Sequence, residues 1–255
     1  MKKLDFMVLG AQKSGTTALA HFLGAHPDIC LAEPKEAHAF DHPDYAGQWT
    51  DELLDEYYGA YFRHAQSERC WGEATPIYLF QAGAAGEIWR YNPHLKLVII
   101  LRDPVERAIS HYTMARQQGY EHLPFWLALL LEPLRMCLGS VPLAEHSMYR
   151  ENSYRGRGLY ARQLLRYFKL FPQRQVLVIS QEELLREHDR TLAKVFAFLG
   201  LENQAITADR VNPGAVPGRY RLSSCLLRLS FWPDLWRLSR LVSFDVKKWA
   251  RGSNG

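Results

Sequence analysis

The sequence predicts an α/β protein in which a central, mostly parallel sheet of about five strands is flanked by helices. Three observations lead to this prediction. Short aliphatic runs alternate along the chain with longer segments of helical period, which is typical of parallel strands connected by helices. The run from Leu97 to Leu101 is apolar throughout, as a strand buried on both faces requires. A glycine-containing loop lies between the first apolar run and the first helical segment.

The elements are expected in the following order along the chain. The aliphatic runs predict strands at 6–10, 29–32, 70–74, 95–101 and 175–180. Apolar residues three and four positions apart predict helices at 15–24, 51–63, 82–91, 105–118, 159–171 and 181–199, the last as one or two helices. Together these elements predict a single domain over 1–255, in which 120–154 and 203–222 are irregular loops of the kind that often cover a bound ligand.

Composition excludes few function classes. The net charge of +4 over 255 residues does not by itself indicate nucleic-acid binding and suits a small anionic ligand equally well. The four cysteines lack CxxC spacing, which argues against a zinc site and for reduced thiols. The apolar run at 6–10 is too short for a signal peptide or a membrane span, so a cytoplasmic protein is expected. Residues 226–249 are apolar but interrupted by charges, which predicts packed terminal helices, with weak membrane-surface contact as the alternative.

The loop at 10–17, Gly-Ala-Gln-Lys-Ser-Gly-Thr-Thr, has the features of an anion site. A strand–loop–helix transition directs backbone N–H groups and the positive end of a helix dipole at one point. Gly15 permits close approach of the backbone, and Lys13 adds a full positive charge. The alternative is an ordinary turn in which Thr16 and Thr17 cap the helix.

The same loop departs from the pattern of nucleoside triphosphatases. Gly10 and Gly15 have the spacing of GxxxxGK[ST], but Thr16 stands where those enzymes have a lysine, and Lys13 comes two residues before Gly15. The missing lysine is the one that contacts the β- and γ-phosphates. The departure therefore argues against a kinase.

A second polar motif follows the strongest strand, at 101–112. Arg102 lies at the carboxyl end of that strand, where open α/β sheets bind ligands, and Pro104 is suited to begin a helix. Ser110 comes about two turns into that helix. An arginine fork together with a hydroxyl can bind a phosphate dianion. The structural alternative is an ion pair of Arg102 with Asp103 or Glu106.

The two motifs together resemble those of the sulfotransferases that use 3'-phosphoadenosine 5'-phosphosulfate (PAPS). They read Lys-Ser-Gly-Thr-Thr at 13–17 and Leu-Arg-Asp-Pro-x-x-Arg-x-x-Ser at 101–110, and the closer resemblance is to the heparan-sulfate and related bacterial branch. Segments 71–78, 158–172, 232–235 and 245–249 are also similar to that branch. The resemblance therefore covers most of the chain and implies one catalytic domain with the P-loop-like sulfotransferase fold.

The resemblance also implies how the donor is bound. In the family the first motif binds the 5'-phosphosulfate and the second binds the 3'-phosphate. By position, the residues implied to bind the donor are Lys13, Ser14, Gly15, Thr16, Thr17, Arg102, Ser110, Tyr160 and Arg219. The implied reaction is in-line transfer of a sulfuryl group to a hydroxyl, with an amine as the alternative, which leaves 3'-phosphoadenosine 5'-phosphate. A small-molecule, carbohydrate or lipid acceptor is expected, without a metal and without a nucleic-acid partner.

The candidate general base lies in the segment 32–41, which follows the second strand and so is expected at the same sheet edge as the phosphate loop. The acidic or basic candidates in this segment are Glu33, Glu36, His38 and Asp41. Glu36 resembles the family's glutamate base in its Glu-x-His-x-Phe context, and His38 is the alternative base or orients the loop. Lys13 is expected to stabilise the leaving phosphate, and Lys35 to face the donor or the acceptor.

Two positions depart from the heparan-sulfate enzymes that the chain resembles. Ala74 stands where those enzymes often have a lysine, and Ala39 precedes Phe40 where the family often has two aromatic residues. These departures put a heparan-type acceptor in doubt. Two other functions stay open at this point. One is a nucleotide-dependent phosphotransferase with a degenerate P-loop, for which Asp103 is the only candidate magnesium ligand near Arg102, and the other is a non-catalytic nucleotide-binding protein.

Overall fold

The computed structural model describes residues 2–42, 49–138, 147–208 and 220–252. The chain divides into two compact units, each described by itself below. Unit 1 comprises residues 1–101 and 165–211, and unit 2 comprises residues 102–164 and 212–255. The single domain over 1–255 stays a prediction.

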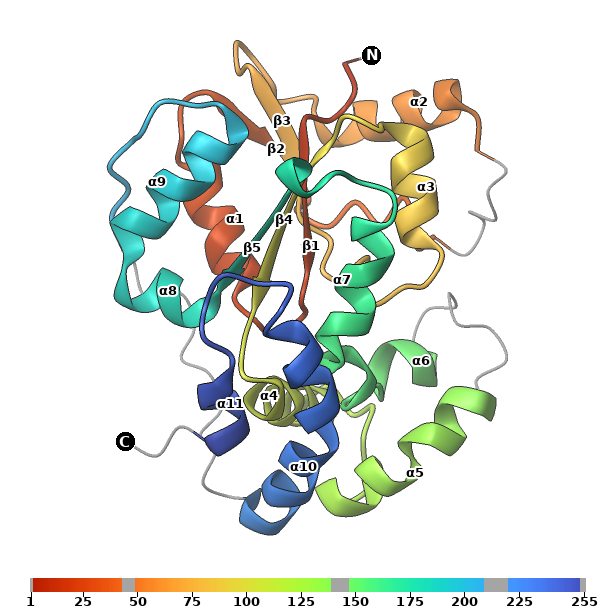
Figure 1. Ribbon diagram of the computed structural model, residues 1–255. Coiled ribbons are helices and arrows are strands. Elements are labelled where there is room, and N and C mark those ends of the chain that lie inside the picture. The colour runs from red at the N-terminus through yellow and green to blue at the C-terminus, as the bar shows by residue number, and fades with distance from the viewer. Residues whose placement is uncertain (1, 43–48, 139–146, 209–219, 253–255) are drawn as a thin grey trace. The chain divides into compact units, whose positions relative to one another are not determined.

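Unit 1 contains a five-stranded parallel sheet in the order β2-β3-β1-β4-β5 (Figure 1). The strands are β1 (Phe6–Gly10), β2 (Ile29–Leu31), β3 (Cys70–Glu73), β4 (Lys96–Leu101) and β5 (Val176–Ser180). All five strands predicted from the aliphatic runs are confirmed to within one residue at each end. Every residue of β1 is buried, as expected for a strand with a neighbour on each side and helices on each face.

The strand order places the end of β1 at a switch point of the sheet. The chain passes from β1 through β2 to β3 on one side of β1, and then crosses to β4 on the other side. Strands β1 and β4 are neighbours, but the connection after β1 leads to β2 at one edge of the sheet and the connection after β4 leads to β5 at the other edge. Such a divergence opens a crevice at the carboxyl ends of the two strands, which is where open α/β sheets bind ligands. The glycine-containing loop at 10–15 begins there.

Helices cover both faces of the sheet in unit 1 (Figure 1). One face carries α1 (Thr16–Gly24), α8 (Gln181–Arg186) and α9 (His188–Leu199), which bury a cluster with Phe6 and Val8 of β1. The alternation of side chains along a strand places these two residues on the same face. The other face carries α2 (Asp51–Tyr61) and α3 (Ala84–Tyr91), where the Tyr58 and Tyr91 rings lie 5.6 Å apart.

Unit 2 is helical in its described residues. It contains α4 (Pro104–Gln117), α5 (Phe125–Leu138), α6 (Met148–Glu151), the first turn of α7 (Tyr160–Phe168), α10 (Arg221–Leu238) and α11 (Lys247–Arg251). Asp103 caps α4 by accepting hydrogen bonds from the backbone N–H groups of Val105 and Glu106. A Cβ atom on Gly158 would lie 2.7 Å from the Phe231 ring, so glycine is needed where α10 packs against this turn.

The predicted helices are confirmed, including two helices within 181–199 and helices in the C-terminal segment. The prediction that 120–154 is irregular is wrong for α5 and α6. Pro133 lies inside α5, where it removes one helical hydrogen bond, but burial of Phe125 and Ala128 and two hydrogen bonds from the backbone N–H groups of Arg155 and Gly156 to Glu132 hold the helix.

The second predicted loop, 203–222, is described only in part. Residues 203–208 form no helix or strand, 209–219 lie outside the described residues, and α10 begins at Arg221. Among the helices in the described part of the chain, none has both the length and the apolar composition to cross a membrane.

Candidate active site

The loop between β1 and α1 has a backbone that requires glycine at two positions. Gly10 has φ 144° and Gly15 has φ 99°, in the region that L-residues rarely adopt. A Cβ atom on Gly10 would lie 2.7 Å from the carbonyl oxygen of Pro76. Lys13 also has a positive φ, 67°, which is uncommon for a residue with a Cβ and is found preferentially at functional sites.

Several features of this loop fit an anionic ligand. The α1 helix has no side-chain cap at Gly15 and no acidic residue in its first turn, so its first N–H groups and its dipole favour an anion. The Ser14 hydroxyl is fully buried and has no hydrogen-bond partner among the described residues. A buried hydroxyl without a partner is costly, and an oxygen of a bound phosphate or sulfate would satisfy it. The residues present therefore fit the phosphosulfate group of PAPS.

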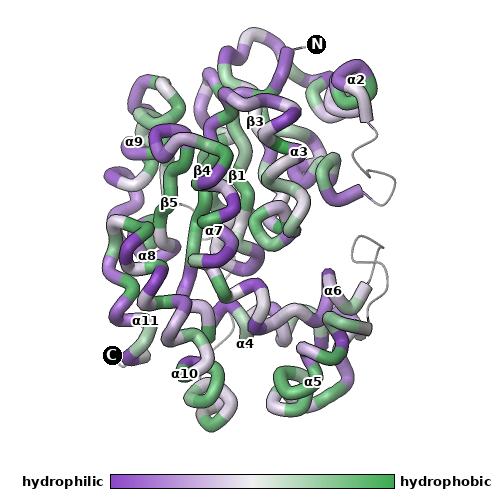
Figure 2. Tube along the Cα trace, turned by 45° about the vertical axis from the view of Figure 1, so that its right-hand side comes forward, coloured by the Kyte–Doolittle hydropathy of each residue, from purple (hydrophilic) through white to green (hydrophobic). Residues whose placement is uncertain are grey.

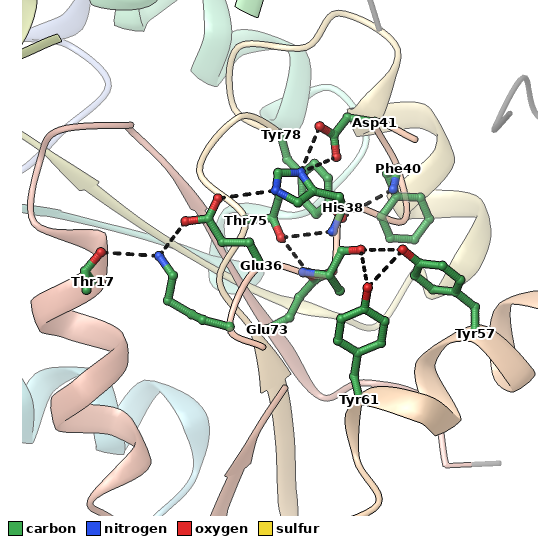
Figure 3. Close-up of polar contacts among 12 residues, drawn as sticks. Thr17, Glu36, His38, Phe40, Asp41, Tyr57, Tyr61, Glu73, Thr75 and Tyr78 are labelled. Atoms are coloured by element: carbon green, nitrogen blue, oxygen red, sulfur yellow. Dashed lines mark hydrogen bonds and ion pairs between the residues drawn. The ribbon is translucent and has the colours of Figure 1, made fainter. Parts of the chain in front are cut away.

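The segment at 35–41 is connected to this loop by Lys35. The Lys35 Nζ atom lies 3.4 Å from Thr17 Oγ1, in the first turn of α1, and 2.8 Å from Glu36 Oε1 (Figure 3). The predicted proximity of the two segments is thus found within unit 1. Lys35 therefore lies between the candidate anion-binding loop and the candidate base.

Glu36 and His38 lie on the same side of their segment. His38 Nε2 is 3.5 Å from Glu36 Oε2, and His38 Nδ1 is 3.0 Å from both carboxylate oxygens of Asp41 (Figure 3). Asp41 is fully buried, whereas the side chains of Glu36 and His38 are 38% and 40% exposed. Glu36 and His38 are therefore accessible to a ligand, whereas the Asp41 carboxylate, which contacts His38, is not.

Glu73, at the end of β3, contacts the backbone of this segment at Ala37. It is fully buried and accepts hydrogen bonds from the Tyr58 hydroxyl at 2.5 Å, the Thr75 hydroxyl at 2.7 Å and the Ala37 N–H at 3.3 Å. Burial raises the pKa of Glu73 to about 7, although these three donors act in the opposite direction.

Two tyrosines of α2 hold the segment from the side. The hydroxyls of Tyr57 and Tyr61 donate to the Ala37 carbonyl at 2.6 and 3.3 Å (Figure 3). With the Glu73 contact to its N–H, both backbone polar groups of Ala37 are satisfied. The segment at 35–41 is therefore held by side chains of Glu73, Tyr57 and Tyr61, which were not identified from the sequence.

The second predicted motif lies in unit 2. Arg102 Nη2 is 2.9 Å from Glu106 Oε2, the ion pair that the structural alternative expected, and the Tyr160 hydroxyl donates to the Arg102 carbonyl at 2.9 Å. Ser110 lies two turns along α4 and is largely buried. The implied roles of Arg102, Ser110 and Tyr160 in binding the donor stay predictions, and Arg219 lies outside the described residues.

Asp103 is occupied by structural contacts. Besides capping α4, its carboxylate lies 3.1 Å from Arg228 Nη1 of α10. A carboxylate committed to a helix cap and an arginine is poorly placed to hold magnesium, which weakens the phosphotransferase alternative. The expectation that no metal takes part stays a prediction.

Of the four candidates for the base, only Glu36 and His38 combine exposure with contact to the loop-linked network. Glu33 is 78% exposed, and its carboxylate lies 3.8 Å from His64 instead. Glu73 was missed because its segment was noted only for its resemblance. Its position at the end of a buried parallel strand could have identified it, because ligands bind at the carboxyl ends of such strands.

Three comparisons place the chain among known proteins. The family model described as "Sulfotransferase domain" matches residues 3–212. Heparan sulfate glucosamine 3-O-sulfotransferase 3B1 of Homo sapiens is 31% identical over 197 residues, which is 77% of this chain and 46% of that protein. Heparan sulfate glucosamine 3-O-sulfotransferase 6 of Mus musculus is 33% identical over 198 residues, 77% of this chain and 52% of that protein. The chain thus spans about half the length of these relatives.

A solved structure is similar over nearly the whole chain. The crystal structure of a sulfotransferase from Alicyclobacillus acidocaldarius has a TM-score of 0.79 and 32% sequence identity. The match covers 98% of this chain and 99% of that one.

Proposed function

The chain belongs to the sulfotransferase domain family, and we propose on this premise that it transfers a sulfuryl group from PAPS to a hydroxyl of an acceptor molecule. The resemblance noted in the sequence is confirmed at the level of the family and of the P-loop-like fold. The observation that carries the proposal is the continuous polar chain from the anion-binding loop to a base. It runs from Thr17 through Lys35, Glu36 and His38 to Asp41.

The loop at 10–17 is proposed to bind the phosphosulfate. The donor supplies an electrophilic sulfur bonded to a phosphate that can leave. The N–H groups at the start of α1 and the Ser14 hydroxyl are suited to bind its anionic oxygens, and Lys13 to neutralise the charge that develops on the leaving phosphate. Lys35, which contacts both Thr17 of the loop and Glu36, is proposed to neutralise negative charge of the bound phosphosulfate.

Glu36 is proposed as the general base. Its carboxylate is partly exposed and lies 2.8 Å from Lys35 Nζ, so it is held next to the candidate anion-binding loop, where it could accept the proton of the acceptor hydroxyl. His38 is proposed to receive a hydrogen bond from the protonated carboxyl or to donate one to the carboxylate. Its two ring nitrogens lie 3.5 Å from Glu36 Oε2 and 3.0 Å from the Asp41 carboxylate, so the ring can be held in place by Asp41 while it contacts Glu36.

The acceptor is proposed to carry a hydroxyl group, with carbohydrates as the first class to test. The relatives named above are heparan sulfate glucosamine 3-O-sulfotransferases, and this supports a sugar hydroxyl. Ala74 is fully buried and has no side chain that could contact a sulfated glycan, whereas its N–H donates to the Lys35 carbonyl at 3.3 Å. We therefore propose an acceptor with less negative charge than heparan sulfate.

The experiment that tests this function is transfer of label from PAPS to a panel of acceptors. The panel contains neutral oligosaccharides, heparan sulfate, polyols, phenols and hydroxyl-bearing lipids. Label is expected on a hydroxyl acceptor, with Glu36→Gln reducing it and Glu33→Gln leaving it unchanged. Label transferred from the γ-phosphate of ATP instead, with none from PAPS, would contradict the proposal in favour of a phosphotransferase.

A further inference from the structure

Helix α10 of unit 2 is apolar on two opposite sides. Its inner side packs into the unit through buried side chains, namely Leu227, Phe231, Leu235 and Leu238. Its outer side carries a second apolar stripe at spacings of three and four residues, namely Leu222, Leu226, Leu229, Trp232 and Trp236. These five side chains are from 52% to 85% exposed among the described residues. A helix that is apolar all round is normally covered on every side, so the outer stripe requires a partner.

Helix α5 carries a similar exposed apolar stripe. Trp126, Leu130 and Leu134 recur every four residues and are each more than half exposed. The two helices begin next to each other, because the rings of Phe125 and Tyr220 lie 5.1 Å apart. Figure 2 shows apolar stretches along both helices. We call the exposed side chains of α5 and α10 the outer apolar face.

The positive charge of the chain is concentrated in the segment that forms α10 and α11. Residues 220–252 contain seven arginines and lysines but only two aspartates, a net charge of +5, whereas the whole chain has +4. The guanidinium of Arg240 lies 3.6 Å from the centre of the Trp236 ring. Lys247, Lys248 and Arg251 of α11 are all exposed. The remainder of the chain is therefore close to neutral, and the asymmetry is local.

We propose that the outer apolar face docks on the surface of a membrane that contains anionic lipids. Leucine and tryptophan on one exposed helical stripe, flanked by arginine and lysine, are the features of a helix that lies in the lipid–water interface. Apolar side chains enter the acyl boundary, tryptophan rings occupy the headgroup level, and the cations pair with anionic headgroups. In a dimer formed through this face, two copies of segment 220–252, each with a net charge of +5, would lie against each other. Their repulsion disfavours self-association.

The test is co-sedimentation of the whole protein with vesicles of phosphatidylcholine alone and of phosphatidylcholine mixed with phosphatidylglycerol. Binding to the mixed vesicles is expected, with a strong decrease at high salt. Leu226→Ser combined with Leu229→Ser should weaken it by about tenfold or more, since two leucines lose their burial in the lipid. Lys247→Gln combined with Lys248→Gln should weaken binding to the mixed vesicles by about fivefold per charge that reaches the surface.

The matched control is Leu185→Ser on α8 of unit 1, whose side chain is 74% exposed but stands outside the outer apolar face. This variant should bind vesicles as the parent protein does.

Every substituted leucine and lysine is exposed, so circular dichroism should show that the variants fold as the parent protein does. Equal loss in the control and the α10 variant would overturn the proposal. So would absence of binding to both vesicles, or a dimer in light scattering that Leu226→Ser with Leu229→Ser converts to a monomer. The result is independent of sulfuryl transfer.

Discussion

His38 lies between two carboxylates, with Nδ1 3.0 Å from both oxygens of Asp41 and Nε2 3.5 Å from Oε2 of Glu36. The two neighbours differ in environment, because Asp41 is fully buried and Glu36 is open to a ligand. This arrangement separates the roles of the three side chains. Glu36 is accessible to an acceptor molecule, and His38 is in contact with Glu36. Asp41 is buried, so it can only orient the His38 ring.

The Glu36→Gln variant tests the general base. Glutamine keeps the size of the side chain but cannot accept the proton, so turnover at saturating PAPS should fall by about 10²–10⁴-fold. Affinity for 3'-phosphoadenosine 5'-phosphate, measured by calorimetry, should change little. Glu33→Gln in the same segment is the control and should keep its turnover, because its carboxylate faces His64. Loss of turnover in His38→Asn while Glu36→Gln stays active would identify His38 as the base instead.

The Asp41→Asn variant tests the positioning of His38. Asparagine retains the shape, but one of its two polar atoms is a donor, so the ring can adopt the wrong tautomer. Turnover should fall by about tenfold or more, with the Michaelis constant for PAPS nearly unchanged. The pH profile of turnover should shift as well, because the charge next to the ring is lost. A parallel rise in the Michaelis constant with no shift of the profile would indicate only a structural role.

The nucleotide with a 3'-phosphate should bind more tightly than the one without it. Charge-assisted hydrogen bonds from Arg102, supported by Ser110, should contribute about 1.5–3 kcal/mol each. In this structure the Arg102 fork is paired with Glu106. Arg102→Lys keeps the charge but loses the fork, so calorimetry should show a smaller difference between the two nucleotides. Equal affinities of the parent protein for the two nucleotides would show that this motif does not bind the 3'-phosphate.

Catalysis should continue in the presence of a chelator. Lys13, the N-terminus of α1 and the backbone N–H groups are expected to neutralise the phosphosulfate. Lys13→Ala should therefore raise the Michaelis constant for PAPS and lower turnover together, because the charge acts on both the bound donor and the leaving phosphate. Activity that a chelator abolishes and magnesium restores would point to a phosphotransferase.

Glu73 should make the stability of the protein depend on pH. Burial raises the pKa of Glu73 to about 7 from the ordinary value of 4.5, so between pH 4.5 and pH 7 the folded protein holds a proton that the unfolded chain has lost. Between these two pH values the contribution of Glu73 to stability decreases as pH rises, by about 3 kcal/mol in total. The Glu73→Gln variant cannot lose this proton. Urea unfolding across this range should show that the stability of the variant relative to the parent increases with pH, and a constant difference would contradict the shift.

The order and type of most elements could be predicted from the sequence because their signals are local. A continuous apolar run such as 97–101 indicates a buried strand, and helical spacing of apolar residues identifies α1, α4 and α9. The anion-binding loop is also local, since Gly10, Lys13 and Gly15 are close in the chain. Helix α5 was not predicted because Pro133 and the charges of its segment weaken the local helical signal, whereas hydrogen bonds from the backbone N–H groups of Arg155 and Gly156 to Glu132 stabilise the helix.

By itself, therefore, the sequence determined the α/β class, the candidate phosphate-binding loop and the short list of candidate bases. The tertiary structure decided which of these residues lie together. It set the strand order, placed Lys35 between Thr17 and Glu36, and put Asp41 behind His38. It also brought the Glu73 carboxylate into contact with the Ala37 N–H. Among the described residues, it left the outer side of α10 uncovered. The physical reason is that burial and hydrogen-bond partners depend on residues far apart in the chain, and local periodicity carries no information about which distant segments meet.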